Sequence, residues 1–146
     1  MPQLSGGSLL RKLLVGYDGS AQSERALAFA VEIASHDEGS MIHIACVVQK
    51  PAGAPDPVPD ELMESLKRSA KETLLNAERM VMKSHVDVTS HIEAGKPGEK
   101  LLELAAALKP DLVVLGTLRH PASERRLGTT SSHFLKSGSC PLLLVP

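Results

Sequence analysis

The sequence has almost no aromatic side chains: they make up 2% of its 146 residues, and Trp is absent. A core without aromatic rings must be filled by aliphatic side chains. The same scarcity argues against a protein that binds single-stranded nucleic acid by stacking bases on aromatic platforms. An excess of charge of one sign is also lacking, because 16 Lys and Arg stand against 17 Asp and Glu, for a formal net charge of −1. We therefore expect no nucleic-acid partner and no binding to a membrane surface.

Long hydrophobic runs and paired cysteines are missing too. No apolar run reaches the roughly 18 residues of a membrane span, and the N-terminal segment lacks the apolar core of a secretory signal peptide. The two cysteines, Cys46 and Cys140, lie in or beside apolar runs without Cys-x-x-Cys spacing, which predicts buried free thiols in a reducing compartment. We expect a cytoplasmic protein with a flexible leader over 1–11 and a single domain over 12–146.

What the sequence does contain is a strict alternation of short apolar runs and helical stripes. Apolar runs bounded by turn residues predict strands over 12–17, 41–48, 86–93, 111–115 and 142–145. Apolar residues at helical spacing predict helices between them, over 20–36, from about 60 to beyond 81, over 97–108 and over about 129–138. Successive βαβ units with right-handed crossovers give an α/β fold, a doubly wound three-layer sandwich with a five-stranded parallel sheet.

Two of these strands have the character of sheet edges. Apolar and polar residues alternate through 86–93, which predicts a half-exposed edge strand. The last strand, Leu142 to Val145, is apolar throughout, and as an open edge it would promote aggregation unless covered. We expect it to pair with the same strand of a second copy about a two-fold axis, forming a homodimer.

The ends of two strands carry residues suited to ligand binding. Gly116 ends one strand, and after a loop with cations the residues Gly128-Thr129-Thr130-Ser131 open a helix, an arrangement that can hold an anion through close backbone approach, free N–H groups and hydroxyls. Asp18 ends the first strand. Because ligands of doubly wound sheets lie beyond the carboxyl ends of the strands where the strand order reverses, we expect Asp18 and Gly116 to line one crevice.

The same residues allow a plainer interpretation. Gly116 and Gly128 would then be turn glycines, Thr129 a helix cap, and the loop cations a solvated face made of Arg119, Arg125 and Arg126. The expected co-location of two motifs in one crevice favours a ligand site over this interpretation.

Five motifs together resemble the universal stress protein family over about residues 12–146. They are Leu14-Val15-Gly16-Tyr17-Asp18-Gly19-Ser20, Gly95-Lys96-Pro97-Gly98, Asp111-Leu112-Val113-Val114-Leu115-Gly116-Thr117, Leu127-Gly128-Thr129-Thr130 and Cys140-Pro141-Leu142-Leu143-Leu144-Val145. The resemblance implies a doubly wound fold of the adenine nucleotide alpha hydrolase-like type that dimerises through its last strand. It also implies ATP binding, which many but not all members of the family show.

The resemblance is incomplete at the phosphate-binding motif. Members that bind ATP carry Gly-x-x-Gly, nine residues, and then Gly-Ser or Gly-Thr. Here Gly116 matches the first glycine, Arg119 stands in place of the second, and eight residues separate Arg119 from Gly128. The arginine side chain would either keep the backbone away from a phosphate or supply a charge-assisted contact to it, and the sequence leaves both alternatives open.

The resemblance implies a role for each matching residue, with ATP as the ligand. Asp18 would accept hydrogen bonds from ribose hydroxyls or the adenine amine, or cap the turn that follows it, and these roles are compatible. Val47 would pack against adenine, or serve only as core. The remaining positions would border the ribose and hold the phosphates, namely Leu115, Gly116, Arg119, Gly128, Thr129 and Thr130. No cluster has metal-ligand spacing, so we expect no metal site in the protein, and Mg²⁺ would arrive with ATP.

These features favour a regulatory protein over an enzyme. The sequence has no nucleophile elbow and no His-x-Gly-His pattern of related adenylyl-transferring enzymes, although slow ATP hydrolysis is compatible with it. One hypothesis is a stress-response homodimer that binds ATP beyond the first and fourth strands. The alternative is a stress-response dimer that works without nucleotide, which the departures at Arg119 and in the loop length support.

Overall fold

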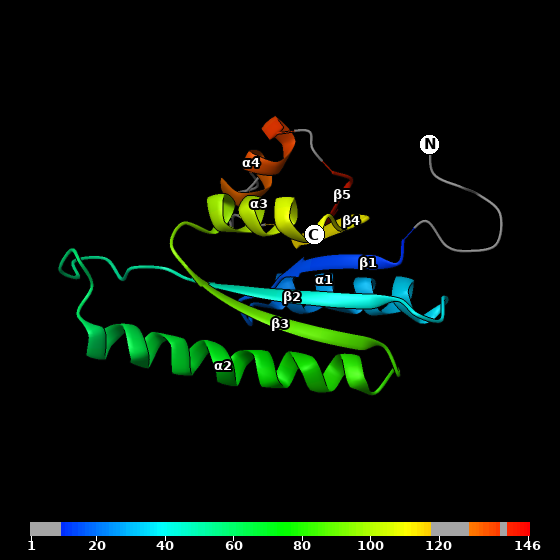
Figure 1. Cartoon of the computed structure of the whole chain (residues 1–146), viewed down its shortest axis with the longest axis horizontal. Coiled ribbons are helices and arrows are strands. Elements are labelled where there is room, and N and C mark those ends of the chain that lie inside the picture. The colour runs from blue at the N-terminus through cyan, green and yellow to red at the C-terminus, as the bar shows by residue number, and fades with distance from the viewer. Residues whose placement is uncertain (1–9, 118–128, 138–139) are drawn as a thin grey trace.

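The fold is a five-stranded, all-parallel sheet with helices on both faces (Figure 1). The computed structural model describes residues 10–117, 129–137 and 140–146. The strands are β1 (Lys12–Gly16), β2 (Met41–Val48), β3 (Asp87–Ala94), β4 (Leu112–Gly116) and β5 (Leu142–Val145), and the helices are α1 (Ala21–Ser35), α2 (Asp60–Met82), α3 (Pro97–Leu108) and α4 (Thr129–Ser137). The predicted α/β doubly wound fold is confirmed, and every predicted element is present.

Two apolar layers flank the sheet, one on each face. Leu13 and Val15 of β1 pack into the cluster formed with α1 and α2, whereas Leu14 between them packs into the cluster formed with α3 and α4. This division follows from the alternation of side chains along a strand. Most of the buried core is aliphatic, as the composition requires, and Tyr17 and Phe134 are its aromatic members among the described residues.

In the strand order β3-β2-β1-β4-β5, β2 and β3 are added on one side of β1 and β4 and β5 on the other, so the strand order reverses at β1. Leu14 is paired with His43 of β2 on one side and with Val113 of β4 on the other. The first βαβ crossovers therefore build one half of the sheet and the later ones build the other half; in Figure 1, α3 and α4 lie above, α2 lies below and α1 lies behind β1 and β2. A crevice opens at such a reversal, beyond the carboxyl ends of the two neighbouring strands.

The strands at the two edges are β3 and β5. The alternating pattern of β3 agrees with its place, since Val88 and Ile92 pack on the core while Thr89 is exposed. At the other edge, Leu142 to Leu144 are half-buried in the single chain. Pairing of this edge with a second copy stays a prediction.

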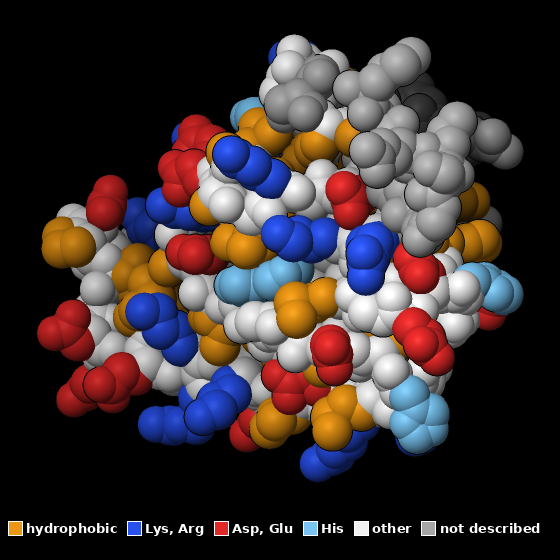
Figure 2. Space-filling model, turned by 45° about the vertical axis from the view of Figure 1, so that its right-hand side comes forward, with side chains coloured by type: hydrophobic (Ala, Val, Ile, Leu, Met, Phe, Trp, Pro, Cys, Tyr) orange, Lys and Arg blue, Asp and Glu red, His pale blue; other side chains and the backbone are white. Residues whose placement is uncertain are grey.

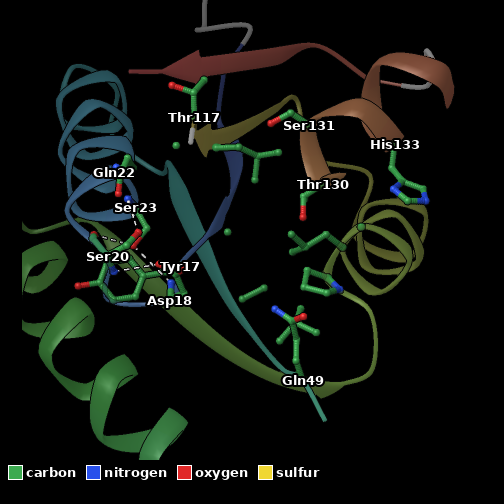
Figure 3. A pocket seen from close by; sticks show the side chains of 18 of the residues that line it. Tyr17, Asp18, Ser20, Gln22, Ser23, Gln49, Thr117, Thr130, Ser131 and His133 are labelled. Carbon is green, nitrogen blue, oxygen red and sulfur yellow. Dashed lines mark hydrogen bonds between the residues drawn. The ribbon is translucent and has the colours of Figure 1, made fainter. Parts of the chain in front are cut away.

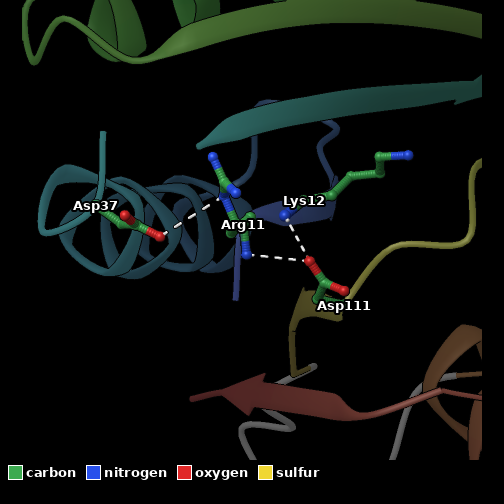
Figure 4. A network of polar contacts seen from close by, with 4 residues as sticks. All are labelled: Arg11, Lys12, Asp37 and Asp111. Atoms are coloured by element: carbon green, nitrogen blue, oxygen red, sulfur yellow. Dashed lines mark hydrogen bonds and ion pairs between the residues drawn. The ribbon is translucent and has the colours of Figure 1, made fainter. Parts of the chain in front are cut away.

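The amino ends of the strands are fastened by polar contacts (Figure 4). One carboxylate oxygen of Asp111, just before β4, accepts hydrogen bonds from the backbone N–H groups of Arg11 at 3.0 Å and Lys12 at 2.9 Å. The Arg11 guanidinium lies 3.9 Å from a carboxylate oxygen of Asp37 beyond α1. These contacts join β1, β4 and the end of α1 at the end of the sheet opposite the crevice.

The described helices include none that combines the length and the apolar character needed to cross a membrane.

Candidate functional site

A cavity of about 450 Å³ lies beyond the carboxyl ends of β1, β2 and β4 and the amino ends of α3 and α4 (Figure 3). Of the residues predicted to form a ligand site, the structure brings together Asp18, Val47, Leu115, Gly116 and Thr130 in the lining of this cavity. The volume is within the range of about 300–1,000 Å³ that is usual for small-molecule sites.

Asp18 is held in place by the start of α1. The backbone N–H of Ser20 donates to Asp18 Oδ1 at 2.9 Å, and the backbone N–H of Asp18 donates to Ser23 Oγ at 3.3 Å. Ser20 in turn caps the helix, because its Oγ accepts from the N–H of Ser23 at 3.2 Å. The turn-capping role is thus present, and it fixes the carboxylate at the cavity wall.

The charge of Asp18 follows from the same contacts. Partial burial raises the pKa of its carboxyl group, but hydrogen bonding with Ser20 and Ser23 outweighs that effect, so the pKa lies below its ordinary value. The group is therefore ionised at neutral pH. Because the side chain is also exposed, it can accept hydrogen bonds from hydroxyl or amine groups of a ligand.

Gly116 has a structural reason to be glycine that involves no ligand. A Cβ at this position would lie 2.6 Å from the backbone carbon and 2.7 Å from the backbone oxygen of Gln22, in the first turn of α1. Glycine here allows the end of β4 to pack against α1. The packing is compatible with a ligand role, but the glycine alone is not evidence for one.

One wall of the cavity is apolar. Val47 near the end of β2 is half-buried and packs, together with Leu115 and Leu101, in the cluster on the α3 and α4 side of the sheet. Val47 is therefore part of the core and of the cavity lining at once, so its two predicted roles are compatible. A flat apolar ring system would bury its faces against such a wall.

The opposite side of the cavity is polar. Thr117, which follows β4, donates its backbone N–H to the carbonyl oxygen of Val145 at 2.8 Å, while Thr130 and Ser131 come from the first turn of α4. In Figure 3 these three residues lie on one side of the cavity and Asp18 on another. The amino end of a helix presents unpaired N–H groups and a partial positive charge, which suits an anion.

Several predicted site residues lie outside the described part of the chain. These are Arg119 and Gly128, together with Arg125 and Arg126 of the same loop. Thr129 begins α4, but its side chain is also outside what the structure describes.

The cavity is also lined by residues that were not predicted as site residues, some of which were predicted only to form a turn. Gln49 follows β2, and Lys96 to Gly98 open α3. A Cβ at Gly98 would lie 2.5 Å from the ring of His133, so this glycine allows α4 to approach α3 at the cavity. The motif Gly-Lys-Pro-Gly was the available signal, since it directly follows a strand whose carboxyl end faces the same edge of the sheet.

A pair of histidines lies outside the cavity lining, on the face of the sheet that α3 and α4 cover. His43 Nδ1 of β2 and His91 Nε2 of β3 are 2.9 Å apart, and Figure 2 shows a histidine patch near the centre of one face of the molecule. Burial lowers the pKa of both imidazoles, and the pKa of His43 is lowered further by His91 and Lys12. No group of three or more His, Cys, Asp or Glu side chains suited to a metal ion occurs within 10–117, 129–137 and 140–146.

Comparison with known proteins places the chain in a family. The model of the universal stress protein family matches residues 10–146. The chain belongs to the universal stress protein family. A curated universal stress protein of Methanocaldococcus jannaschii is 31% identical over 144 residues, which cover 97% of this chain and 85% of the relative.

Solved structures of universal stress proteins have the same fold. UspA of Lactobacillus plantarum superposes with a TM-score of 0.78 at 25% identity, covering 92% of this chain and 97% of that one. A universal stress protein family member of Arabidopsis thaliana, solved with AMP bound, gives a TM-score of 0.69 at 19% identity, covering 92% of this chain and 90% of that one. At this identity the second similarity supports the fold alone.

Proposed function

We propose that this universal stress protein binds an adenine nucleotide, ATP, in the cavity beyond β1 and β4 and acts as a regulatory homodimer in the stress response. The observation that carries the proposal is the union in one cavity of an ionised Asp18, an apolar wall at Val47 and the amino end of α4. These are the three chemistries that a ribose, a base and a phosphate chain require.

In this proposal each part of the nucleotide lies on its own side of the cavity. Adenine would pack on Val47, the ribose hydroxyls would donate to Asp18, and the phosphates would lie at Thr130 and the amino end of α4. From the sequence, Gly128, Thr129 and Arg119 would complete the phosphate contacts. Mg²⁺ would be held by the phosphates of the nucleotide.

We propose a regulatory role rather than a metabolic reaction, since the sequence lacks the motifs of nucleophilic and adenylyl-transfer catalysis. Slow hydrolysis of bound ATP is compatible with this role. The expected setting is the cytoplasm, and the expected dimer contact is β5, whose half-buried leucines form one edge of the sheet.

The second candidate is a stress-response dimer that works without nucleotide. The packing of Gly116 on Gln22 favours it, because this packing requires glycine at position 116 even when no ligand is bound. The altered loop at Arg119 favours it as well.

Thermal unfolding with and without Mg-ATP separates the two candidates. A ligand at a hundredfold excess over its Kd stabilises a protein by about 2.7 kcal/mol, which raises the Tm of a domain of this size by several degrees. We expect such a rise in the native chain and a much smaller one in Asp18→Ala. Ser20→Ala is the matched control, because it weakens the same helix start without removing the carboxylate. No rise in the native chain at millimolar Mg-ATP would favour the nucleotide-independent candidate.

A further inference from the structure

One end of the cavity, beyond β2, carries a side-chain amide. Gln49 follows directly after β2, and the N–H of Gly95 donates to the carbonyl oxygen of Val48 at 3.0 Å, which ties this end of β2 to the turn that opens α3. Figure 3 shows the Gln49 side chain reaching into the cavity on the side opposite Thr117 and Ser131. The backbone from which Gln49 projects is thus held by pairing between the end of β2 and the turn before α3.

The neighbours of Gln49 define what this end can hold. Val47, two residues earlier and near the end of β2, lines the cavity together with Ala45, Leu101 and Pro97. These side chains form an apolar slot beside the start of α3, whereas Thr130 and the amino end of α4 lie on another side of the cavity. A heteroaromatic base that enters the slot buries its faces on apolar groups but brings ring nitrogens and an exocyclic group with it, and these lose hydrogen bonds to water unless polar partners replace them.

Gln49 has the chemistry to replace those hydrogen bonds. A glutamine amide offers a carbonyl oxygen that accepts and an NH₂ group that donates. Adenine offers the complementary pair along one edge, an amine that donates and a ring nitrogen that accepts, and Gln forms this paired contact with adenine in other settings.

We propose that Gln49 binds the edge of the nucleobase and determines which base the site prefers. The inference rests on the proposed nucleotide-binding function and goes further by naming the residue that contacts the base. Gln49 is a specificity-determining residue in this assignment, separate from Asp18 at the ribose and from α4 at the phosphates.

The decisive variant is Gln49→Glu. A carboxylate only accepts hydrogen bonds, so it cannot donate to the ring nitrogen of adenine. Guanine instead presents two donors side by side, its ring N–H and its amine, which suit a carboxylate. We expect the ratio of GTP affinity to ATP affinity to rise about tenfold or more in Gln49→Glu, the low end of the discrimination that one paired contact gives. Gln49→Ala should weaken ATP binding about five- to tenfold without favouring GTP.

Gln22→Glu is the matched control. Gln22 lines the same cavity from α1, near Asp18, and the substitution makes the same change of charge. A purely electrostatic effect on the phosphates would weaken ATP and GTP alike in both variants and leave their ratio unchanged. Gln49 is exposed at the rim, so its variants should fold, and circular dichroism melts of each full-length variant verify this.

Isothermal titration of Mg-ATP and Mg-GTP into the native chain and the three variants gives the result. A change of the ratio in Gln49→Glu but not in Gln22→Glu supports the assignment. If the native chain binds ATP and the ratio is the same in Gln49→Glu, the role of Gln49 is overturned while the nucleotide function stands. If the native chain binds neither nucleotide at millimolar concentration, both proposals are overturned together.

Discussion

The contact between Gly116 and the first turn of α1 predicts that Gly116→Ala destabilises the protein even without a ligand. The new Cβ would lie 2.6–2.7 Å from backbone and Cβ atoms of Gln22, closer than carbon and oxygen atoms tolerate. Backbone atoms at the start of a capped helix cannot turn aside as a flexible side chain can. Since Gly116 is not in the left-handed region, the cost is steric rather than conformational.

The expected loss in the free energy of unfolding is about 1–3 kcal/mol, the cost of forcing a methyl group into packed structure when the neighbouring backbone must shift. For a domain of this size, a loss of that magnitude lowers the Tm by roughly 3–12 °C. Gly16→Ala is the matched comparison, because there a Cβ would meet the methyl end of Leu115 at 2.8 Å and that of Leu101 at 3.2 Å. Side chains can move, so we expect a smaller loss in Gly16→Ala.

Urea unfolding followed by circular dichroism, without nucleotide, measures both variants. Gln22→Ala combined with Gly116→Ala should not restore stability, because the contacting backbone atoms of residue 22 remain. A Gly116→Ala variant as stable as the native chain would refute the packing argument. The glycine would then have to be explained by the close approach of a ligand to the backbone.

Two further predictions concern the sheet. The pKa values of His43 and His91 are both lowered in the folded chain, so the unfolded chain binds more protons than the folded one below pH 6.5. The free energy of unfolding should therefore fall as the pH drops from 7 to 5, and urea unfolding at several pH values measures this slope. A His43→Asn/His91→Gln variant that kept the slope would contradict its assignment to these two histidines. For the β5 edge, sedimentation equilibrium of the native chain at micromolar concentration should give a dimer, and a monomer would count against pairing through Leu142–Val145.

The order of elements could be predicted from the sequence because the pattern of each segment is local. The stripe of α2 and the apolar runs of β1 and β4 depend on spacing within a single element, and the edge position of β3 follows from its alternation. The strand order is different, because the pairing of β1 with β4 joins distant segments, and no pattern within one element encodes it.

The finer features of the site depend on contacts between distant segments. The reason for glycine at 116 is an atom of Gln22, and the reason for glycine at 98 is the ring of His133 on another helix. His43 and His91 meet diagonally across β2 and β3, which only the strand register decides, since His91 is paired with Ala45. Local pattern therefore predicted several residues that line the cavity but not how these residues pack against one another.

The walls of the cavity come from both halves of the chain. Asp18 and Val47 belong to the half that ends with β3, whereas Leu115 and Thr130 belong to the half that begins with α3, and the two halves meet along the pairing of β1 with β4. A ligand that touches both halves resists their separation with its own binding energy. A bound nucleotide would therefore hold the two halves of the sheet together. The rate at which a protease cleaves the opened chain would then fall as the ligand concentration rises.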